Sequence, residues 1–367
     1  MQQPQTLAGL TTPAAVVDID RMTANLDRMA EYAARHGLAH RPHVKTHKIP
    51  ALASEQIRRG CPGLTVATLR EAEVMARVCD DLLLAYPPVG AEKLRRLLAL
   101  PESVRLTVSL DSAEALDPLA AAAAAAGRTL GVLVELDLGM HRVGIADPRA
   151  AAELAARAAN AQGVELRGVM FYPGHIREPA GDQDAALRRL SDDLAAHLAA
   201  FRDRGLRATL VSGGSTPTAF QSHHVAGITE IRPGTYIFND RTTAAIDACA
   251  WSDCAYTILA TVVSTAVPGQ AVVDAGSKAI NREELRGAGG GGFGALLDRP
   301  EVVVRAMSEE HGLLDLSRTD WRPRIGERVR IVPNHVCISV NLHRELWGVR
   351  DDRVDAYWEV EARGWRS

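Results

Sequence analysis

Short apolar runs alternate with longer amphipathic runs through the part of the chain before residue 245. We predict helices over 69–78, 91–100, 112–126, 148–161 and 182–204, and strands over 13–20, 64–68, 81–86, 104–109, 130–137, 164–172, 207–212 and 228–232. A further helix is predicted to begin at Asp20, which stands where an N-cap residue belongs. Strands that are apolar on both faces are typical of parallel sheets. The pattern therefore favours an α/β fold whose repeats fit a (β/α)8 TIM-type barrel.

The pattern changes near residue 245. From there, β-type segments follow one another without helices between them, over 258–265, 271–274, 301–307, 328–332, 336–340, 346–349 and 353–360. This series predicts a C-terminal antiparallel β-domain. We therefore expect a segment 1–20 that joins the β-domain, a barrel at 21–244 and the β-rich domain at 245–367. The glycine-rich stretch 287–294 is predicted to be a flexible connector, because no strand-to-helix context supports a phosphate-binding loop.

Composition narrows the class of protein. The formal net charge is -3, so we expect no general binding to nucleic acid. No window reaches the roughly 20 consecutive apolar residues of a membrane span, so we expect a soluble protein without membrane contact. The five cysteines are scattered, and the N-terminus has no signal-peptide pattern. We predict a reducing, cytoplasmic location.

One stretch concentrates positive charge. Residues 41–48 contain Arg41, His43, Lys45, His47 and Lys48 within eight positions. Such side chains repel one another, and the cluster suggests that an anion such as a phosphate lies among them. Neighbouring cations also lower the pKa of a lysine, which leaves its amine available as a nucleophile toward a carbonyl. The alternatives are a solvated basic turn or a nucleic-acid patch.

Candidate chemistry also follows four of the predicted barrel strands. These segments contain an arginine, an aromatic ring with a histidine, a glycine-rich loop with hydroxyls, and a second glycine turn: Arg142, Tyr172, His175, 212–218 and 232–236. Active sites of such barrels lie at the carboxyl ends of the strands, and loops after the last two strands often bind phosphate. We therefore expect a phosphorylated cofactor at the barrel mouth. A nucleophilic lysine, a phosphate cradle and an arginine together suggest pyridoxal phosphate (PLP).

Nine motifs in order resemble the D-threonine aldolase and D-serine dehydratase family. They are Arg41-Pro-His-Val-Lys45-Thr-His-Lys48, Glu71-Ala-Glu73, Asp137-x-Gly-x-x-Arg142-x-Gly144, Tyr172-x-Gly-His175, Ser212-Gly-Gly-x-Thr216-Pro-Thr218, Arg232-Pro-Gly-Thr-Tyr236, Asp274-Ala-Gly-Ser-Lys278, Glu309-Glu-His-Gly312 and Pro333-Asn-His335-x-Cys337. The resemblance runs from about residue 12 to residue 364. It implies the alanine-racemase-type fold, a barrel followed by a β-domain, and PLP as cofactor.

The resemblance also assigns roles. It implies that Lys45 is the Schiff-base lysine, Arg142 lies at the pyridine nitrogen and Tyr172 contacts the cofactor ring. The phosphate would be held by the loop with Ser212, Gly213, Gly214 and Thr216, together with Gly234 and Tyr236. An arginine at the pyridine nitrogen disfavours its protonation and weakens the electron sink, so bond cleavage needs further help.

That help is expected from a metal in the β-rich domain. The family binds a divalent metal at the Pro-x-His-x-(Cys or Asp) position, which assigns His335 and Cys337 as ligands. Alternate residues of a strand point to one face, so an imidazole and a thiolate there can share an ion. A thiolate favours zinc over manganese or magnesium. A buried histidine beside a structural cysteine is the alternative.

The motifs divide between two reactions. The dehydratase branch typically has cysteine at the second ligand, so Cys337 favours deamination of D-serine or D-threonine to a 2-oxo acid and ammonia, with Lys45 taking the Cα proton. The segments Val340-Asn-Leu342 and Ala362-Arg-Gly364 look more like bacterial aldolases, where His175 would be the base on the β-hydroxyl. We predict a PLP-dependent lyase, with dehydration favoured and retro-aldol cleavage as the alternative.

Two other classes are less favoured. An amino-acid racemase needs no metal pair, and a non-catalytic PLP-binding protein lacks the β-domain. Candidates for lining the substrate site are Arg241, His311 and Asn341. Family members are commonly homodimers, and we expect one here.

Overall fold

A computed structural model describes residues 4–285 and 291–364 of the chain. Its contacts divide the chain into two compact units. One unit contains Met29–Gly234, and the other combines Met1–Arg28 with Thr235–Arg363. We call the first the barrel unit and the second the β-rich unit, and each is described by itself.

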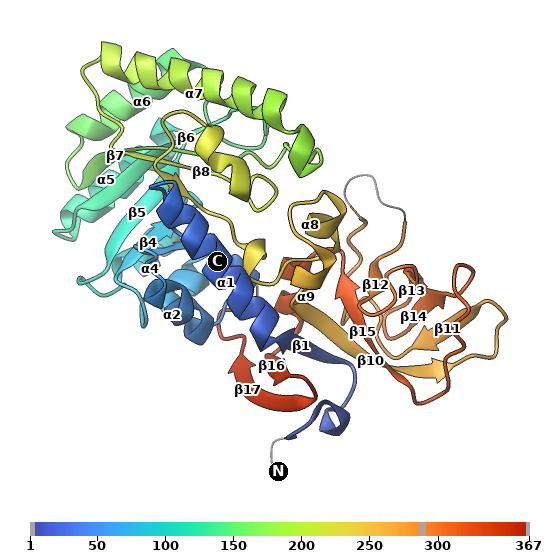
Figure 1. Cartoon of the computed structure of the whole chain (residues 1–367). Coiled ribbons are helices and arrows are strands. Elements are labelled where there is room, and N and C mark those ends of the chain that lie inside the picture. The colour runs from blue at the N-terminus through green and yellow to red at the C-terminus, as the bar shows by residue number, and fades with distance from the viewer. Residues whose placement is uncertain (1–3, 286–290, 365–367) are drawn as a thin grey trace. The chain divides into compact units, whose positions relative to one another are not determined.

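The barrel unit is built on eight parallel strands. They follow the order β2-β9-β8-β7-β6-β5-β4-β3, and a parallel bridge between His43 and Thr65 joins the two ends of this series. The predicted barrel is therefore confirmed (Figure 1). The strands are β2 (Ala39–His40), β3 (Leu64–Val66), β4 (Asp81–Leu84), β5 (Arg105–Leu110), β6 (Leu130–Leu136), β7 (Val164–Phe171), β8 (Leu210–Gly213) and β9 (Glu230–Ile231).

Helices follow the strands as the apolar spacing predicted. The hydroxyl of Thr68 accepts the N–H of Glu71 at 3.1 Å at the start of one helix, and Asp147 accepts that of Ala150 at 3.0 Å at another. The helices are α2 (Pro50–Arg58), α3 (Leu69–Met75), α4 (Ala91–Leu98), α5 (Ala113–Ala125), α6 (Pro148–Asn160) and α7 (Asp184–Asp203). Across the described part of the chain, none of the helices is long and apolar enough to span a membrane.

The cap predicted for the first helix is wrong. Helix α1 (Ile19–Arg35) begins one residue before Asp20, and the side chain of Asp18 accepts the N–H of Arg21 at 3.0 Å. Asp20 lies in the first turn and pairs with Arg350 at 2.9 Å. Either aspartate could cap a helix. Asp18 does so because it ends strand β1 and has the extended backbone of an N-cap residue, whereas Asp20 is already helical.

In its described residues, the β-rich unit contains nine strands in one connected sheet system. Strand β1 lies between β10, with which it pairs antiparallel, and β16, with which it pairs parallel; the other pairs are antiparallel. The strands are β1 (Ala14–Asp18), β10 (Tyr256–Ser264), β11 (Gln270–Val273), β12 (Gly294–Leu296), β13 (Val304–Met307), β14 (Gly312–Asp315), β15 (Arg328–Pro333), β16 (Glu345–Arg350) and β17 (Arg353–Glu359).

One predicted strand is a helix. Residues 336–340 belong to α9 (Val336–Leu342), whose first N–H, that of Val336, donates to Asp240 Oδ2 at 3.1 Å. A five-residue apolar run does not distinguish strand from helix. Strands β2, β12 and β14 were not predicted; they are two, three and four residues long. Most of the predicted glycine connector, 287–290, lies outside the described residues.

Candidate active site

The charge of the 41–48 stretch is balanced by the protein itself. Arg41 pairs with Asp81 at 2.6 Å and with Glu230 at 2.7 Å, and Lys48 pairs with Glu71. All five side chains are buried. Internal carboxylates thus neutralise two of its cations, and the anion expected among the others stays a prediction.

Two histidines of the stretch are neutral. Burial lowers the pKa of His47 to about 4, and its ring donates to Gln56 and accepts the N–H of Ile49. Burial also lowers the pKa of His43 well below its usual value, with further lowering by the charges of Lys45 and Arg232. Within the described residues, the buried Nδ1 of His43 has no hydrogen-bond partner. An orphaned buried nitrogen of this kind is suited to meet a ligand atom.

Lys45 differs from the other cations of the stretch. It lies in the single turn η2 (Val44–Thr46), and no carboxylate of the described residues pairs with it. Its Nζ lies 5.8 Å from the centroid of the Tyr172 ring, and Arg142 Cζ lies 5.0 Å from the same centroid. A Cβ on Gly174 would come within 2.2 Å of that ring, so glycine is needed beside it. The structure thus brings together three of the predicted residues.

The loop after β6 is shaped around Asp137. Asp137 Oδ1 accepts the N–H groups of Gly139 and His141 at 3.1 and 2.9 Å, and Oδ2 contacts the His141 ring at 2.9 Å. Partial burial opposes ionisation of Asp137, but these hydrogen bonds lower its pKa overall. Gly144 has φ +102°, and a Cβ there would lie 2.6 Å from the Asp137 nitrogen. The loop presents Arg142 as an exposed side chain.

His175 lies beside this loop. A Cβ on Gly139 would come within 2.9 Å of His175 Nε2, so the ring packs directly against the glycine. Partial desolvation lowers the pKa of His175. Its exposed imidazole is therefore a proton acceptor near neutral pH.

The predicted phosphate loop follows β8. Gly214 has φ +87°, and a Cβ on Gly213 would come within 2.1 Å of the Phe171 ring. Thr216 is buried at the following turn. Ser212 differs from the prediction in its contacts, because its hydroxyl donates to Glu230 at 2.5 Å and accepts from Arg232 at 2.6 Å.

The second glycine turn follows β9. A Cβ on Gly234 would come within 2.6 Å of the His43 carbonyl oxygen and 2.9 Å of Thr46 Oγ1, so this backbone packs directly on the turn that holds Lys45. Tyr236 is buried in η5 (Thr235–Ile237) and belongs to the β-rich unit.

A second group of site residues lies in the β-rich unit. His335 is the N-cap residue of α9, and its Nδ1 donates to Asp240 Oδ2 at 3.2 Å. Cys337 Sγ lies 3.7 Å from Thr235 Oγ1. Burial opposes protonation of His335, but the Cys337 thiolate and Asp240 raise its pKa to about 10. Over residues 4–285 and 291–364, no three His, Cys, Asp or Glu side chains form a metal-binding group.

Asp240 was not predicted as part of this group. It is 1% exposed and also accepts the N–H of Thr243 at 2.9 Å in the capping box of α8 (Arg241–Ala245). The sequence signal was an aspartate three residues before a threonine at a helix start. Nothing in that signal pointed to His335, which lies 95 positions away.

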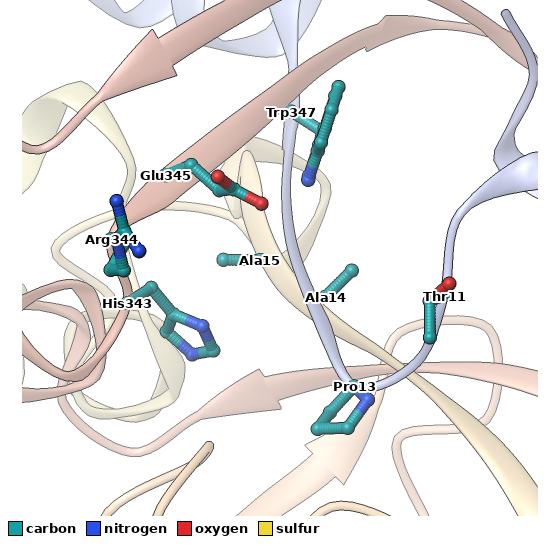
Figure 2. Close-up of a pocket in the computed structure, with 8 residues that line it drawn as sticks. All are labelled: Thr11, Pro13, Ala14, Ala15, His343, Arg344, Glu345 and Trp347. Atoms are coloured by element: carbon teal, nitrogen blue, oxygen red, sulfur yellow. The ribbon is translucent and has the colours of Figure 1, made fainter. Parts of the chain in front are cut away.

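A pocket of about 240 Å³ in the β-rich unit contains none of the predicted site residues. Figure 2 shows it between strand β1 and the segment 343–347, with the lining residues Thr11, Pro13, Ala14, Ala15, His343, Arg344, Glu345 and Trp347. His343 donates to the Ala279 carbonyl at 2.9 Å, and Glu345 accepts from Tyr357 at 3.1 Å. We assign it no role.

Two family models match almost the whole chain. One, described as alanine racemase, N-terminal domain, matches residues 17–242, and the other, described as putative serine dehydratase domain, matches residues 255–349. D-threonine aldolase of Arthrobacter sp is 31% identical over 98% of this chain and 94% of its own length. The chain belongs to the D-threonine aldolase and D-serine dehydratase family. D-threo-3-hydroxyaspartate dehydratase of Delftia sp. (strain HT23), also a lyase of this family, is 35% identical over 98% of this chain and 99% of its own length.

Solved structures of the D-threonine aldolase and D-serine dehydratase family superpose closely. D-threonine aldolase from Filomicrobium marinum has a TM-score of 0.88 at 35% identity and covers 99% of this chain and 98% of its own. The Delftia dehydratase has a TM-score of 0.89 at 32% identity and covers 99% and 100%. Two structures of alanine racemase of Clostridium difficile 630 share the fold, each with a TM-score of 0.69, at 11% and 12% identity. The family consists of lyases of the fold-type III class of PLP enzymes.

Proposed function

We propose that the chain is a PLP- and divalent-metal-dependent lyase that deaminates D-β-hydroxy amino acids of the D-serine and D-threonine type. The reaction removes the Cα proton and the β-hydroxyl and then takes up one water, so the net products are a 2-oxo acid and ammonia. The observation that carries the choice of reaction is the pair His335 and Cys337 in the β-rich unit, of which His335 is held by Asp240.

The barrel unit suits PLP. Lys45 has no carboxylate partner in the described chain, and the buried Nδ1 of His43 lacks a hydrogen bond. Glycines 213 and 234 stand where a Cβ would clash with neighbouring protein atoms, and Gly214 has φ +87°, so both loops have the glycine-rich backbone that suits a phosphate cradle. In this proposal Lys45 forms the Schiff base, Arg142 faces the pyridine nitrogen and Tyr172 contacts the ring. Thr216 and Tyr236 complete the phosphate site, and Ser212 supports it through Arg232.

Each side chain then has a task. Bound PLP would supply the electron sink that makes the Cα proton acidic. Lys45 accepts that proton, because its amine is the one in the 41–48 stretch that no carboxylate engages. His175, with its lowered pKa, exchanges a proton at the β-hydroxyl.

The β-rich unit suits a metal. Because His335 Nδ1 is engaged by Asp240, its Nε2 is the ring atom that would bind a metal beside Cys337, and carboxylate support of this kind is typical of metal-binding histidines. Two protein ligands leave positions open for water or substrate, as in catalytic metal sites. The metal would polarise the β-hydroxyl as a Lewis acid. The thiolate of Cys337 favours zinc over manganese or magnesium.

The spacing of this pair supports dehydration. Structures of the Delftia dehydratase include alanine variants of a histidine and of a cysteine two positions later, and the cysteine variant is in a metal-free form. His335 and Cys337 have the same identity and spacing.

Retro-aldol cleavage to glycine and an aldehyde is the second candidate. It is favoured by the placement of the exposed His175 against Gly139, which suits a base for a β-hydroxyl proton, and by the two aldolases that match the chain end to end. A homodimer and a cytoplasmic location also remain proposals.

Product analysis tests this function. The purified protein would be incubated with D-serine and with D-threonine, with PLP, with zinc or manganese, and with EDTA as control. Pyruvate or 2-oxobutyrate with ammonia, lost on chelation, is expected. Glycine and acetaldehyde from D-threonine would replace the dehydratase with the aldolase, and full activity after complete metal removal would refute the metal's role.

A further inference from the structure

Two loops of the barrel unit are joined by a buried glutamine. The β7–α7 loop (residues 172–183) contains the candidate base, and the β8 loop (residues 214–218) belongs to the predicted phosphate site. Gln183, the last residue of the β7–α7 loop, is 0% exposed. Its Nε2 donates to the Glu178 carbonyl at 3.0 Å and to the Pro217 carbonyl at 3.1 Å. One side chain thus holds the backbones of both loops.

The two donated bonds are what the side chain of Gln183 contributes. Carbonyl oxygens only accept, so the group that faces both of them is the NH2 of the amide. Among the described residues, the buried Oε1 of Gln183 has no hydrogen-bond partner. A buried acceptor without a donor is destabilising, and an apolar side chain of similar size would avoid that cost.

A second glutamine strengthens the link. Gln221 lies in η4 (Ala219–His224), directly after the β8 loop, and its Nε2 donates to the Ala180 carbonyl of the β7–α7 loop. The main chain of Gln183 is also fixed, because its carbonyl accepts the N–H of Leu187 in helix α7 at 2.9 Å. The link between the loops therefore starts from a 20-residue helix.

Both ends of the link lie close to site residues. Pro217 directly follows Thr216, which is expected to hold the phosphate. At the other end, Glu178 is three positions after His175. The turn around His175 is closed by the N–H of the buried Ile176, which donates to the Pro173 carbonyl at 3.3 Å. A shift of the Glu178 carbonyl is therefore passed on to the imidazole of His175.

We infer that Gln183 is a positioning residue that couples the two loops, so that an anion bound at the β8 loop also fixes the β7–α7 loop and the imidazole of His175. The inference rests on the proposed function, in which the β8 loop holds the cofactor's phosphate and His175 exchanges a proton at the β-hydroxyl. The base is then held in place only when the cofactor is bound. Because coupling is reciprocal, an ordered β7–α7 loop also strengthens phosphate binding.

Hydrogen exchange of the full chain tests the coupling without catalysis. Exchange in the two loops would be followed by mass spectrometry without ligand, with inorganic phosphate and with PLP. The proteins are the wild type, Gln183→Leu and the control Gln162→Leu, whose glutamine is exposed and lies outside both loops. In the wild type and the control, either ligand should slow exchange in both loops at least about fivefold. In Gln183→Leu the ligands should slow exchange in the β8 loop alone.

A double-variant cycle with His175→Asn tests the coupling in the loaded enzyme. Product formation from D-serine and D-threonine would be measured for the wild type, both single variants and the double variant. Gln183→Leu should lower kcat about 10- to 100-fold, because the base is misplaced, and change KM less than about threefold. With His175→Asn already present, the same change should lower kcat less than about threefold, since no base remains to be positioned. Gln183→Glu keeps the shape and loses the donors, so it should behave like Gln183→Leu.

The outcomes are distinct. Slower exchange in the β8 loop alone of the wild type, or an equal loss of kcat with and without His175, would overturn the inference and leave the proposed function standing. Slower exchange in neither loop would refute both, because the β8 loop would then bind no phosphate. Products from neither substrate would refute the proposed function, and the exchange measurement would then decide the coupling by itself.

Discussion

Removal of one side of the Lys48–Glu71 ion pair should destabilise the barrel unit. The side chains are 9% and 0% exposed. In Lys48→Met the carboxylate of Glu71 stays buried and, among the described residues, keeps the N–H of Ala67 as its donor, which Oε2 accepts at 2.6 Å. Breaking a buried pair from one side costs about 3–5 kcal/mol. Methionine is nearly as long as lysine and is also unbranched. The strained backbone at position 48, with φ of 59°, therefore costs both residues about the same, and the change in stability reports the loss of the charge.

Urea unfolding of five proteins measures this cost: the wild type, Lys48→Met, Glu71→Gln, the double variant and one control. We expect Lys48→Met to lose about 3–5 kcal/mol of unfolding free energy, and the double variant Lys48→Met/Glu71→Gln to recover most of it, since no bare charge remains. The control is Arg58→Met, which breaks the exposed pair with Glu55 and should cost less than about 1 kcal/mol. A loss below about 1 kcal/mol for Lys48→Met, or a double variant as unstable as the sum of the singles, would refute the reasoning.

Three further predictions concern the cofactor, the metal and pH. Lys45→Ala should lose the visible absorbance of a PLP Schiff base while its circular dichroism is unchanged; an unaltered spectrum would remove Lys45 from the site. Asp240→Asn should weaken zinc binding about 10- to 100-fold in chelator competition, because the support of His335 is lost, and unchanged affinity would exclude His335 as a ligand. The pKa of His47 is about 4 in the folded chain against 6.5 in the unfolded chain. Between these pH values the unfolded state binds one more proton, so the free energy of unfolding falls as the pH falls, by about 3 kcal/mol in all. The variant His47→Asn should show a smaller change of melting temperature with pH between pH 6.5 and 4, and a slope equal to that of the wild type would contradict this prediction.

The barrel was predictable because its signals are long and repeated. Helices such as α6 and α7 carry 13 and 20 residues of consistent spacing, and their ends agree with the prediction to within two residues. The prediction of a strand at 336–340 was wrong because the conformation of this segment depends on the contact of Val336 with Asp240, 96 positions away in the sequence. Local periodicity contains no information about such a partner.

In the candidate site, too, features set by local spacing were predicted and contacts between distant residues were not. Motif order predicted the glycines, Lys45 and the loop around Arg142, since their spacing is local. The carboxylates that neutralise Arg41 and Lys48 lie up to 189 positions away in the sequence. Because local spacing does not reveal such distant partners, the sequence predicted an external anion. Arg241 stood among the candidates for lining the site, but only the structure shows that no carboxylate of residues 4–285 and 291–364 pairs with its guanidinium.

Charge placement also separates the two lysines of the 41–48 stretch. Both are flanked by histidines or cations, so their local sequence does not say which amine is free to react. Lys48 turns inward at φ 59° and is engaged by Glu71, whereas Lys45, three positions earlier, sits in the turn whose backbone packs on Gly234 and faces the Tyr172 ring. The buried ion pair with Glu71 thus makes the amine of Lys48 unavailable as a nucleophile. The same pair anchors the turn that holds Lys45. We therefore expect the double variant Lys48→Met/Glu71→Gln to have a lower kcat than the wild type even though its stability is restored, because a neutral pair holds the turn with Lys45 less firmly than the ion pair does.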